Sequence, residues 1–264
     1  MTVLYALGSG SKGNCFALES GGATLLLDAG FSAREIARRA DQVGLSLASI
    51  VGIALTHEHG DHATGVAQLA RKLGVPVAAS PGTWACLRTY LPGTSHVPIG
   101  LGTRAELGPF TLHAAGTSHD AAEPVALLIE SDDGVRLGVA YDLGRPTTGV
   151  RFLLRELTAL VLEANHDEVL LRTSDYPPSV RQRIAGSGGH LSNRAAAELL
   201  AELVHPGLET IVLAHLSERC NSDAEARATV EPALQAAGFR GSLHVARQAE
   251  PLPPLALQAS SVRS

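Results

Sequence analysis

The sequence predicts an α+β protein in which two β-sheets pack together and helices cover their outer faces. Short apolar runs bounded by Gly, Pro, Ser, Asn and Asp recur along the whole chain, a pattern typical of strands. Amphipathic stretches with helical spacing lie between these runs in both halves of the chain. Each half therefore supplies a sheet with its helices, and two such sheets bury their apolar faces against each other.

The first half opens with strands joined by Gly-Ser-Asn turns and continues with helices between strands. Ser32 suits the N-cap of the first helix, and Gly74 suits the end of the second. The expected strands are Val3–Leu7, Cys15–Leu18, Thr24–Leu27, Ile50–Leu55 and Val75–Ala79. The expected helices are Ser32–Ala40, Ala63–Leu73 and Thr83–Tyr90.

The second half begins with a run of strands and ends with helices alternating with strands. The Asp133-Gly134 turn between two of these strands is a strong hairpin signal. The expected strands are Arg104–Leu107, Phe110–Ala115, Val125–Ile129, Val135–Ala140, Thr158–Leu162, Thr210–Leu213 and Ser242–Val245. The expected helices are Ser192–Leu203 and Ala224–Ala236, and the Pro-, Ala- and Ser-rich residues 248–264 are expected to be a disordered tail.

The composition limits where this protein works and what it binds. A net charge of −5 provides no general attraction to nucleic acid or to anionic lipid, so any such contact needs a local basic patch. Three scattered cysteines make a disulfide framework improbable and fit a reducing compartment. Neither a basic leader nor a membrane-length apolar run is present, so we expect a cytoplasmic protein without a membrane partner.

The stretch His57-Glu58-His59-Gly60-Asp61-His62 is the most informative in the chain. Imidazole and carboxylate groups are ligands that divalent metals prefer. The stretch directly follows the apolar run 50–55, and a strand end followed by a turn can direct the side chains at 57, 59, 61 and 62 toward one point. A helix would place only residues three or four apart on one face. The stretch therefore predicts the metal site of a hydrolase.

Further candidate ligands stand where other apolar runs end. Asp142 follows the strand 135–140 beside a glycine, a position from which a carboxylate can bridge two metals. His119 and His215 also follow strands, and His190 stands just before a helix. A single histidine at any of these places is more often structural, but their recurrence in a chain with the 57–62 cluster favours a role in the site.

These motifs resemble the metallo-β-lactamase superfamily and, more narrowly, its YycJ/WalJ-like branch. The order His-x-His-x-Asp-His, followed by His, Asp and His at strand ends, carries the resemblance, and Asp28 matches the early aspartate motif. Segments 8–15, 56–62, 118–120, 162–167, 188–192 and 213–217 resemble the branch. The resemblance implies that residues 1–247 form one metallo-β-lactamase domain, a four-layer αββα sandwich with a dinuclear centre between the sheets.

The same resemblance implies a ligand set for two divalent ions, Zn²⁺ or Mn²⁺. His57, His59 and His119 would hold one ion, Asp61, His62 and His215 the other, and Asp142 would bridge them. His113 is the rival of His119, but it lies in the middle of a strand, where a structural histidine is more usual.

The resemblance also implies a 5′→3′ DNA exonuclease linked to DNA repair, with nucleic acid as the partner; the sequence gives no indication of a protein partner. Paired metals lower the pKa of bound water from about 15.7 toward about 7. Asp61 would orient the attacking water, and His190 would protonate the leaving oxygen, since histidine titrates near neutrality. A role for His190 in binding phosphate or metal stays open. Glu163 and His166 are expected to orient ligand histidines.

Two segments are candidates for substrate contact. Backbone N–H groups and small side chains of the loop holding Ser9, Ser11 and Asn14 could cradle a phosphate, although a plain hairpin loop is an equal alternative. Seven arginines between Asp142 and His215 could line a groove for the phosphate backbone. They are Arg145, Arg151, Arg155, Arg172, Arg181, Arg183 and Arg194, and acidic neighbours make a solvated face the alternative for any one of them.

Other functions share the expected fold. An RNA-processing nuclease and a small-molecule (thio)ester hydrolase use the same ligands. A helicase-like β-CASP insertion does not fit between Asp142 and His215, and a di-iron oxidoreductase would want a carboxylate in place of His59. A metal-stabilised regulatory protein without catalysis is the non-enzymatic alternative, and the complete ligand set argues against it.

Overall fold

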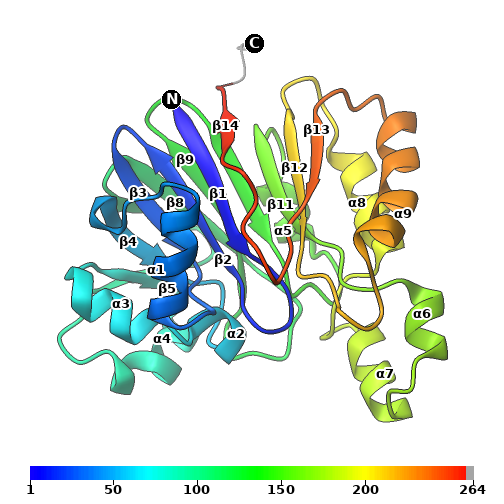
Figure 1. The fold of residues 1–264 in the computed structure, drawn as a ribbon, viewed down its shortest axis with the longest axis horizontal. Helices are drawn as coiled ribbons and strands as arrows, with labels where there is room; N and C mark the ends of the chain where they lie inside the picture. The colour runs from blue at the N-terminus through cyan, green and yellow to red at the C-terminus, as the bar shows by residue number, and fades with distance from the viewer. Residues whose placement is uncertain (260–264) are drawn as a thin grey trace.

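The computed structural model describes residues 1–259 and consists of two seven-stranded sheets packed face to face (Figure 1). The first sheet has the order β14-β1-β2-β3-β4-β5-β6 and the second β13-β12-β11-β10-β9-β8-β7. The first contains β1 (Thr2–Gly8), β2 (Cys15–Ser20), β3 (Ala23–Leu27), β4 (Ile50–Ala54), β5 (Val77–Ala79), β6 (His96–Pro98) and β14 (Leu255–Leu257). The second contains β7 (Ala105–Leu107), β8 (Phe110–Gly116), β9 (Val125–Ser131), β10 (Arg136–Ala140), β11 (Ala159–Glu163), β12 (Thr210–Ala214) and β13 (Ser242–Val245).

Helices cover the outer face of each sheet, which completes the four-layer αββα sandwich (Figure 1). The first sheet is covered by α1 (Ala33–Gln42), α3 (Val66–Leu73) and α4 (Pro81–Leu87), and the second by α5 (Thr148–Leu153), α8 (Asn193–Leu203) and α9 (Asp223–Ala236). The remaining helices are α2 (Gly60–Ala63), α6 (Glu168–Thr173), α7 (Pro178–Ala185) and the 3₁₀ turns Leu47–Ser49 and Arg88–Tyr90. No helix within residues 1–259 is long and apolar enough to cross a bilayer.

Strand direction decides where the candidate site forms. Strands β3 to β6 run parallel in the first sheet, and β10 to β13 run parallel in the second. Parallel strands end at the same edge of a sheet, and open α/β sheets bind ligands at the carboxyl ends of their strands. The loops that carry the predicted ligands therefore meet at one edge of the sandwich.

The prediction of a disordered tail over residues 248–264 is wrong for the part that the structure describes. Leu255–Leu257 form β14, which pairs antiparallel with β1, and Leu257 is 3% exposed in the core between the sheets. A short apolar segment beside prolines can still complete a sheet edge when an open strand lies next to it. Residues 260–264 of the predicted tail lie outside the described residues.

Candidate metal centre

The stretch His57–His62 follows β4 and runs into α2, and backbone contacts from two loops hold it in place. Asn14 N donates to the carbonyl of Asp61 (2.8 Å), and Ala29 N donates to the carbonyl of His62 (2.8 Å). A Cβ atom on Gly30 would lie 1.7 Å from the Asp61 carbonyl oxygen, so only glycine permits this approach. These contacts hold the backbone that presents the predicted ligands.

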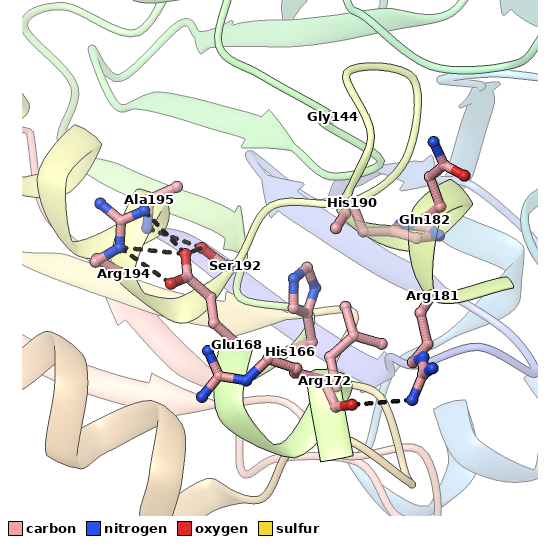
Figure 2. Close-up of a pocket in the computed structure, with 12 residues that line it drawn as sticks. Gly144, His166, Glu168, Arg172, Arg181, Gln182, His190, Ser192, Arg194 and Ala195 are labelled. Carbon is pink, nitrogen blue, oxygen red and sulfur yellow. Dashed lines mark hydrogen bonds and ion pairs between the residues drawn. The ribbon is translucent and has the colours of Figure 1, made fainter. Parts of the chain in front are cut away.

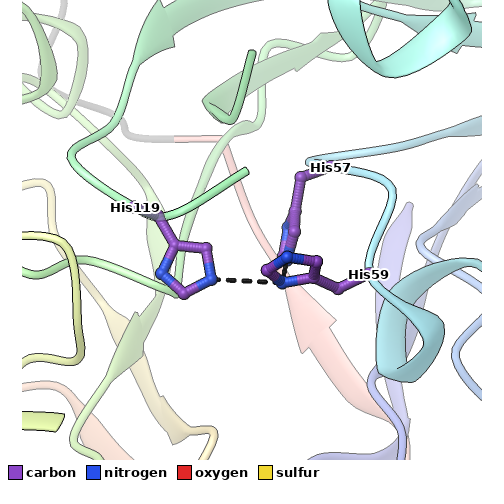
Figure 3. Close-up of side chains that lie close together, drawn as sticks. All are labelled: His57, His59 and His119. Atoms are coloured by element: carbon purple, nitrogen blue, oxygen red, sulfur yellow. Dashed lines mark hydrogen bonds between the residues drawn. The ribbon is translucent and has the colours of Figure 1, made fainter. Parts of the chain in front are cut away.

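His57, His59 and His119 form a first cluster that joins the two sheets (Figure 3). His59 Nδ1 lies 3.1 Å from His57 Nε2 and 3.3 Å from His119 Nε2. Ligand atoms about 2.0–2.1 Å from a tetrahedral zinc ion are separated by about 3.3–3.4 Å. The three ring nitrogens therefore have the spacing of ligands around one ion.

Asp61, His62 and His215 form a second cluster of the same kind. Asp61 Oδ2 lies 3.4 Å from His62 Nε2 and 3.3 Å from His215 Nε2. Burial opposes ionisation of Asp61, but hydrogen bonds from His215 and His62 hold the pKa of its carboxyl well below the usual range. The carboxylate therefore stays ionised, as a metal ligand must be.

Asp142 lies between the two clusters. Its Oδ2 is 2.8 Å from His62 Nε2 and 3.9 Å from His57 Nε2, and the residue is 2% exposed. Although burial disfavours its charge, His215 and His62 hold the pKa of Asp142 well below normal. Oδ2 nevertheless has no hydrogen bond of acceptable geometry to any described residue. A buried, ionised and unsatisfied oxygen is costly unless a cation compensates it, so these side chains fit a pair of divalent ions.

Ring nitrogens that point away from the clusters are held by oxygen atoms, which sets the orientation of each imidazole. His62 Nδ1 lies 2.7 Å from Asp28 Oδ2, and His215 Nδ1 lies 3.2 Å from Glu163 Oε1. His119 Nδ1 lies 3.2 Å from the carbonyl of Gly189. If each ring keeps its proton on Nδ1 and loses the one on Nε2, as metal binding requires, Nε2 would offer a lone pair to the site.

Asp28 receives hydrogen bonds from two residues that the sequence did not reveal. Thr56 donates to it from its backbone N (2.8 Å) and from Oγ1 (2.7 Å), and the Tyr141 hydroxyl donates at 2.8 Å. Both residues stand directly beside predicted ligands, Thr56 before His57 and Tyr141 before Asp142. Adjacency to a ligand is the only signal in the sequence that could have identified them.

Three site residues adopt the left-handed backbone conformation within two residues of a strand end. The φ angles of Asp28, Asp142 and His215 are 55°, 56° and 57°. Residues other than glycine rarely adopt this conformation, and such strain concentrates at functional sites. The sharp turn lets a side chain leave the strand and enter the gap between the sheets.

His190 stands beside the second cluster and is held by two carboxylates. Its Nδ1 lies 2.8 Å from Glu163 Oε1 and 3.1 Å from Asp142 Oδ1. Burial disfavours the imidazolium, but the Glu163 and Asp142 carboxylates raise the pKa of His190 to about 10. Glu163 is itself fully buried, and its second oxygen accepts from the backbone N atoms of Leu143 (2.7 Å) and Leu191 (3.0 Å). Asp142, Glu163, His190 and His215 also place one possible ligand atom each within 4.8 Å of the others, so a ligand role for His190 stays open.

The other predicted residues lie at varying distance from the clusters. Ser9 and Asn14 are buried: the Ser9 hydroxyl donates to Asn14 Oδ1 and accepts from His215 N (2.8 Å). Their side chains thus support the ligand loops, while Ser11 is exposed beside them. His166 is buried and makes no side-chain hydrogen bond to the predicted ligands, and His113 pairs with Glu130 (3.1 Å) away from both clusters.

Comparisons with known proteins identify the class of protein that this fold and site define. The chain belongs to the beta-lactamase superfamily: the family model described as "Beta-lactamase superfamily domain" matches residues 23–216. The metallo-β-lactamase-fold protein YhfI from Bacillus subtilis superposes with a TM-score of 0.71 at 17% identity, covering 95% of this chain and 98% of YhfI. The predicted fold and family are therefore confirmed.

Two curated relatives are closer in sequence. The chain is 33% identical to "Exodeoxyribonuclease YycJ" of Bacillus anthracis over 236 residues, covering 88% of this chain and 89% of the relative. It is also 33% identical to "Exodeoxyribonuclease WalJ" of Streptococcus pneumoniae strain D39 over 221 residues, covering 81% of each. Both similarities extend well beyond the 57–62 motif and agree with the predicted branch.

Proposed function

We propose that this chain is a metal-dependent phosphodiesterase that acts as a 5′→3′ DNA exonuclease in cytoplasmic DNA repair. The observation that carries the proposal is the pair of ligand clusters with the orphaned oxygen of Asp142 between them. The relatives named exodeoxyribonucleases support DNA as the substrate, because the chain aligns with nearly their whole length.

In this proposal each predicted ligand has a role that the two clusters support. His57, His59 and His119 would hold one ion, Asp61, His62 and His215 would hold the other, and Asp142 would be shared by both. Zn²⁺ suits these imidazole-rich sites, and Mn²⁺ can use the same residues. Two such ions would acidify water and stabilise the negative charge that develops on a phosphoryl group.

Residues of this chain then control the proton and the geometry. Asp61, ionised and only partly buried, accepts a hydrogen bond from the attacking water and orients it toward phosphorus. Water oxygen bonds to phosphorus and releases a proton to the solvent as the bond from phosphorus to the 3′ oxygen of the terminal nucleotide breaks. The expelled oxygen receives its proton from His190, whose imidazole is held in position by Glu163.

The proposal is tested with full-length protein stripped of metal and reloaded with Mn²⁺ or Zn²⁺, incubated with 5′-labelled and 3′-labelled DNA and RNA. Metal-dependent release of nucleotides from the 5′ end of DNA is expected, and the double substitution Asp61→Ala, His62→Ala should abolish it. Absence of cleavage on every nucleic acid, with two ions bound per chain, would overturn the proposal.

The role of His190 has its own test. In His190→Ala, kcat on DNA should fall by about 10²–10⁴-fold while two ions remain bound, because a proton donor and not an essential ligand is lost. Loss of an ion from this variant, measured as metal content per chain, would assign His190 to the ligand set instead.

A further inference from the structure

The loop that carries His119 leaves the second sheet and contacts the first half of the chain. This segment, the His119 loop, comprises residues 117–124 between β8 and β9. At its end, Val125 N donates to the carbonyl of Thr56 (3.0 Å), the residue just before the 57–62 stretch. How His119 meets the other two histidines of the first cluster depends on how the rest of this loop is held.

Glu58 stands between two predicted ligands of the 57–62 stretch, and its side chain reaches the His119 loop. Its Oε1 accepts a hydrogen bond from the backbone N of Ala122 (2.7 Å), and its Oε2 accepts one from the Thr83 hydroxyl (3.4 Å). Among the described residues, Glu58 belongs to no group of candidate metal ligands. Its carboxylate therefore contacts the loop and α4 and not an ion.

Other contacts hold the same end of the loop to the start of α4. The Ser80 hydroxyl donates to the carbonyl of Glu123 (2.6 Å), and Glu123 Oε2 accepts from the backbone N of Gly82 (2.6 Å). Within residues 1–259, the bond from Ala122 to Glu58 is the one hydrogen bond by which the backbone of the His119 loop contacts a side chain of the 57–62 stretch. A carboxylate acceptor makes this bond stronger than one between neutral groups.

The contact between Glu58 and the loop is separate from the pocket on the other side of the metal centre. That pocket, of about 590 Å³, lies beside His190, and its walls come from α6, α7 and the first turn of α8 (Figure 2). None of its lining residues belongs to the 57–62 stretch or to the His119 loop. A substitution at Glu58 should therefore disturb predicted ligands without removing a wall of this pocket.

We propose that Glu58 is a positioning residue for His119. By holding Ala122, it sets the distance between His119 and the other two histidines, and thereby the affinity of the first cluster for its ion. The distance between His119 Nε2 and His59 Nδ1 is 3.3 Å. Ligands that are held in place lose less freedom when an ion binds, so a looser loop should cost affinity. The consequence for DNA cleavage rests on the proposed exonuclease function.

Zinc binding to the full-length, metal-stripped protein tests this role without DNA. Competition with a chromophoric chelator measures the affinity for each of the two ions. Glu58→Ala should weaken the binding of one ion by about 10–100-fold and leave the other unchanged, because residues that orient metal ligands typically have effects of this size. Urea unfolding of each metal-free variant establishes that it is folded.

Two further substitutions separate the reach of the side chain from its charge. Glu58→Gln removes the charge but keeps an oxygen that can accept from Ala122, so its zinc affinity should stay within about threefold of the wild type. Glu58→Asp keeps the charge but is one methylene shorter, so it should resemble Glu58→Ala. If Glu58→Ala does not fold, the comparison of these two variants still decides the question.

Glu19→Ala is the matched control. Glu19 is also a half-buried glutamate of the first half and accepts a hydrogen bond, from the Tyr5 hydroxyl (3.0 Å). It lies at the end of β2 opposite the ligand loops, so its removal should leave the affinity for both ions unchanged.

A double-mutant cycle with His119→Ala shows whether Glu58 acts through His119. In the His119→Ala background, Glu58→Ala should cause no further loss of zinc affinity. Fully additive losses would overturn the proposal, as would wild-type affinity in both Glu58→Ala and Glu58→Asp. Zinc binding by Glu58→Gln that is as weak as in Glu58→Ala would also overturn it, because charge and not the contact would then matter.

DNA cleavage separates failure of this role from failure of the proposed function. At saturating metal, Glu58→Ala should regain the wild-type kcat on DNA. Wild-type zinc affinity in Glu58→Ala and Glu58→Asp, together with normal DNA cleavage, would refute the role of Glu58 and leave the exonuclease standing. The expected losses of zinc affinity in a protein whose wild type cleaves no DNA would refute the exonuclease alone.

Discussion

The two sheets contribute to the metal centre in different ways. On the first sheet the single stretch His57–His62, which follows β4 and runs into α2, supplies four predicted ligands, two to each cluster. On the second sheet the predicted ligands His119, Asp142 and His215 come from three loops that are far apart in the sequence. The first contribution comes from residues that are neighbours in the sequence, and the second exists only after the strands have paired and the sheets have packed. Metal binding and packing of the two sheets should therefore be coupled.

The substitution with the largest expected effect removes the charge that the two clusters share. Asp142→Asn should lower DNA hydrolysis by about 10³-fold, because several kcal/mol of charge stabilisation by the ions depend on this ligand. Both ions should bind more weakly, measured as metal content after dialysis. His215→Ala is the comparison from the same sheet and should lose one ion and keep the other. Retention of two tightly bound ions by Asp142→Asn would contradict the bridging position.

The next effect distinguishes the carboxylates that orient ligand histidines in the two halves. Asp28→Asn, behind His62, and Glu163→Gln, behind His215, should each weaken metal affinity by about 10–100-fold. Glu163 also holds His190, so Glu163→Gln should keep a lowered kcat even when metal is saturating. In contrast, Asp28→Asn should regain the wild-type kcat at saturating metal. Metal titrations and kcat at saturating metal measure the two effects separately. Equal recovery of both variants would show that Glu163 does not position His190.

The difference between the two sheets also explains which parts of the candidate site could be predicted from the sequence. The apolar runs located most strands within one or two residues. The 57–62 stretch could be recognised as a candidate metal site because its predicted ligands are neighbours in the sequence. Asp142, His119 and His215 were recognised only through their strand-end positions and a family resemblance. Spacing alone cannot show which strands become neighbours in a sheet.

The segment between β11 and α8 shows where prediction from the sequence stopped. Helices α6 and α7 are short, and α7 buries none of its residues, so neither has an apolar stripe that periodicity could detect. The segment was expected to contribute arginines to a groove, and Arg172, Arg181 and Arg194 do line a pocket. In contrast, Arg151 pairs with Glu202 and Arg183 with Asp120, and the sequence could not separate the two groups because these partners are distant along the chain.

Two glycines allow a matched comparison of loop packing in the two halves. A Cβ atom on Gly30 would lie 1.7 Å from the Asp61 carbonyl oxygen, and one on Gly144 would lie 1.9 Å from that of Ser187. Either substitution to alanine should cost about 1–3 kcal/mol of unfolding free energy, because backbone must move. Gly30→Ala should also weaken metal binding by shifting the 57–62 loop. Gly144→Ala should spare the metals and lower kcat by shifting the loop that precedes His190. Denaturant unfolding measures the loss of stability, and metal titration measures the metal affinity of each variant. The same metal affinity in the two variants would contradict the prediction that only Gly30→Ala disturbs the metal ligands.

The smallest expected effect concerns the hydrogen bond that joins the halves directly. Tyr141 follows β10 of the second sheet, stacks on Phe16 between the sheets and donates to Asp28, which follows β3 of the first. Tyr141→Phe keeps the ring and removes the hydroxyl, so it should lower stability by about 1 kcal/mol near neutral pH. Burial and the Asp28 carboxylate raise the pKa of the Tyr141 hydroxyl well above its usual value of 10.0.

The pH dependence of that difference tests whether the hydroxyl is as isolated as the structure indicates. Above pH 10 the unfolded chain releases the Tyr141 proton while the folded chain retains it, so the unfolded state binds fewer protons and wild-type stability falls as pH rises. The contribution of the hydroxyl is therefore fully present below pH 10 and is lost as pH approaches the raised pKa of the folded state. Tyr141→Phe lacks this group, and the other three tyrosines are present in both proteins, so the comparison isolates Tyr141. The stability difference between wild type and variant should stay constant up to about pH 10 and shrink above it, measured by urea unfolding. A stability difference that persists unchanged to pH 11 would mean that the hydroxyl titrates as if exposed. The hydrogen bond from Tyr141 to Asp28 would then not hold the two halves together as the structure indicates.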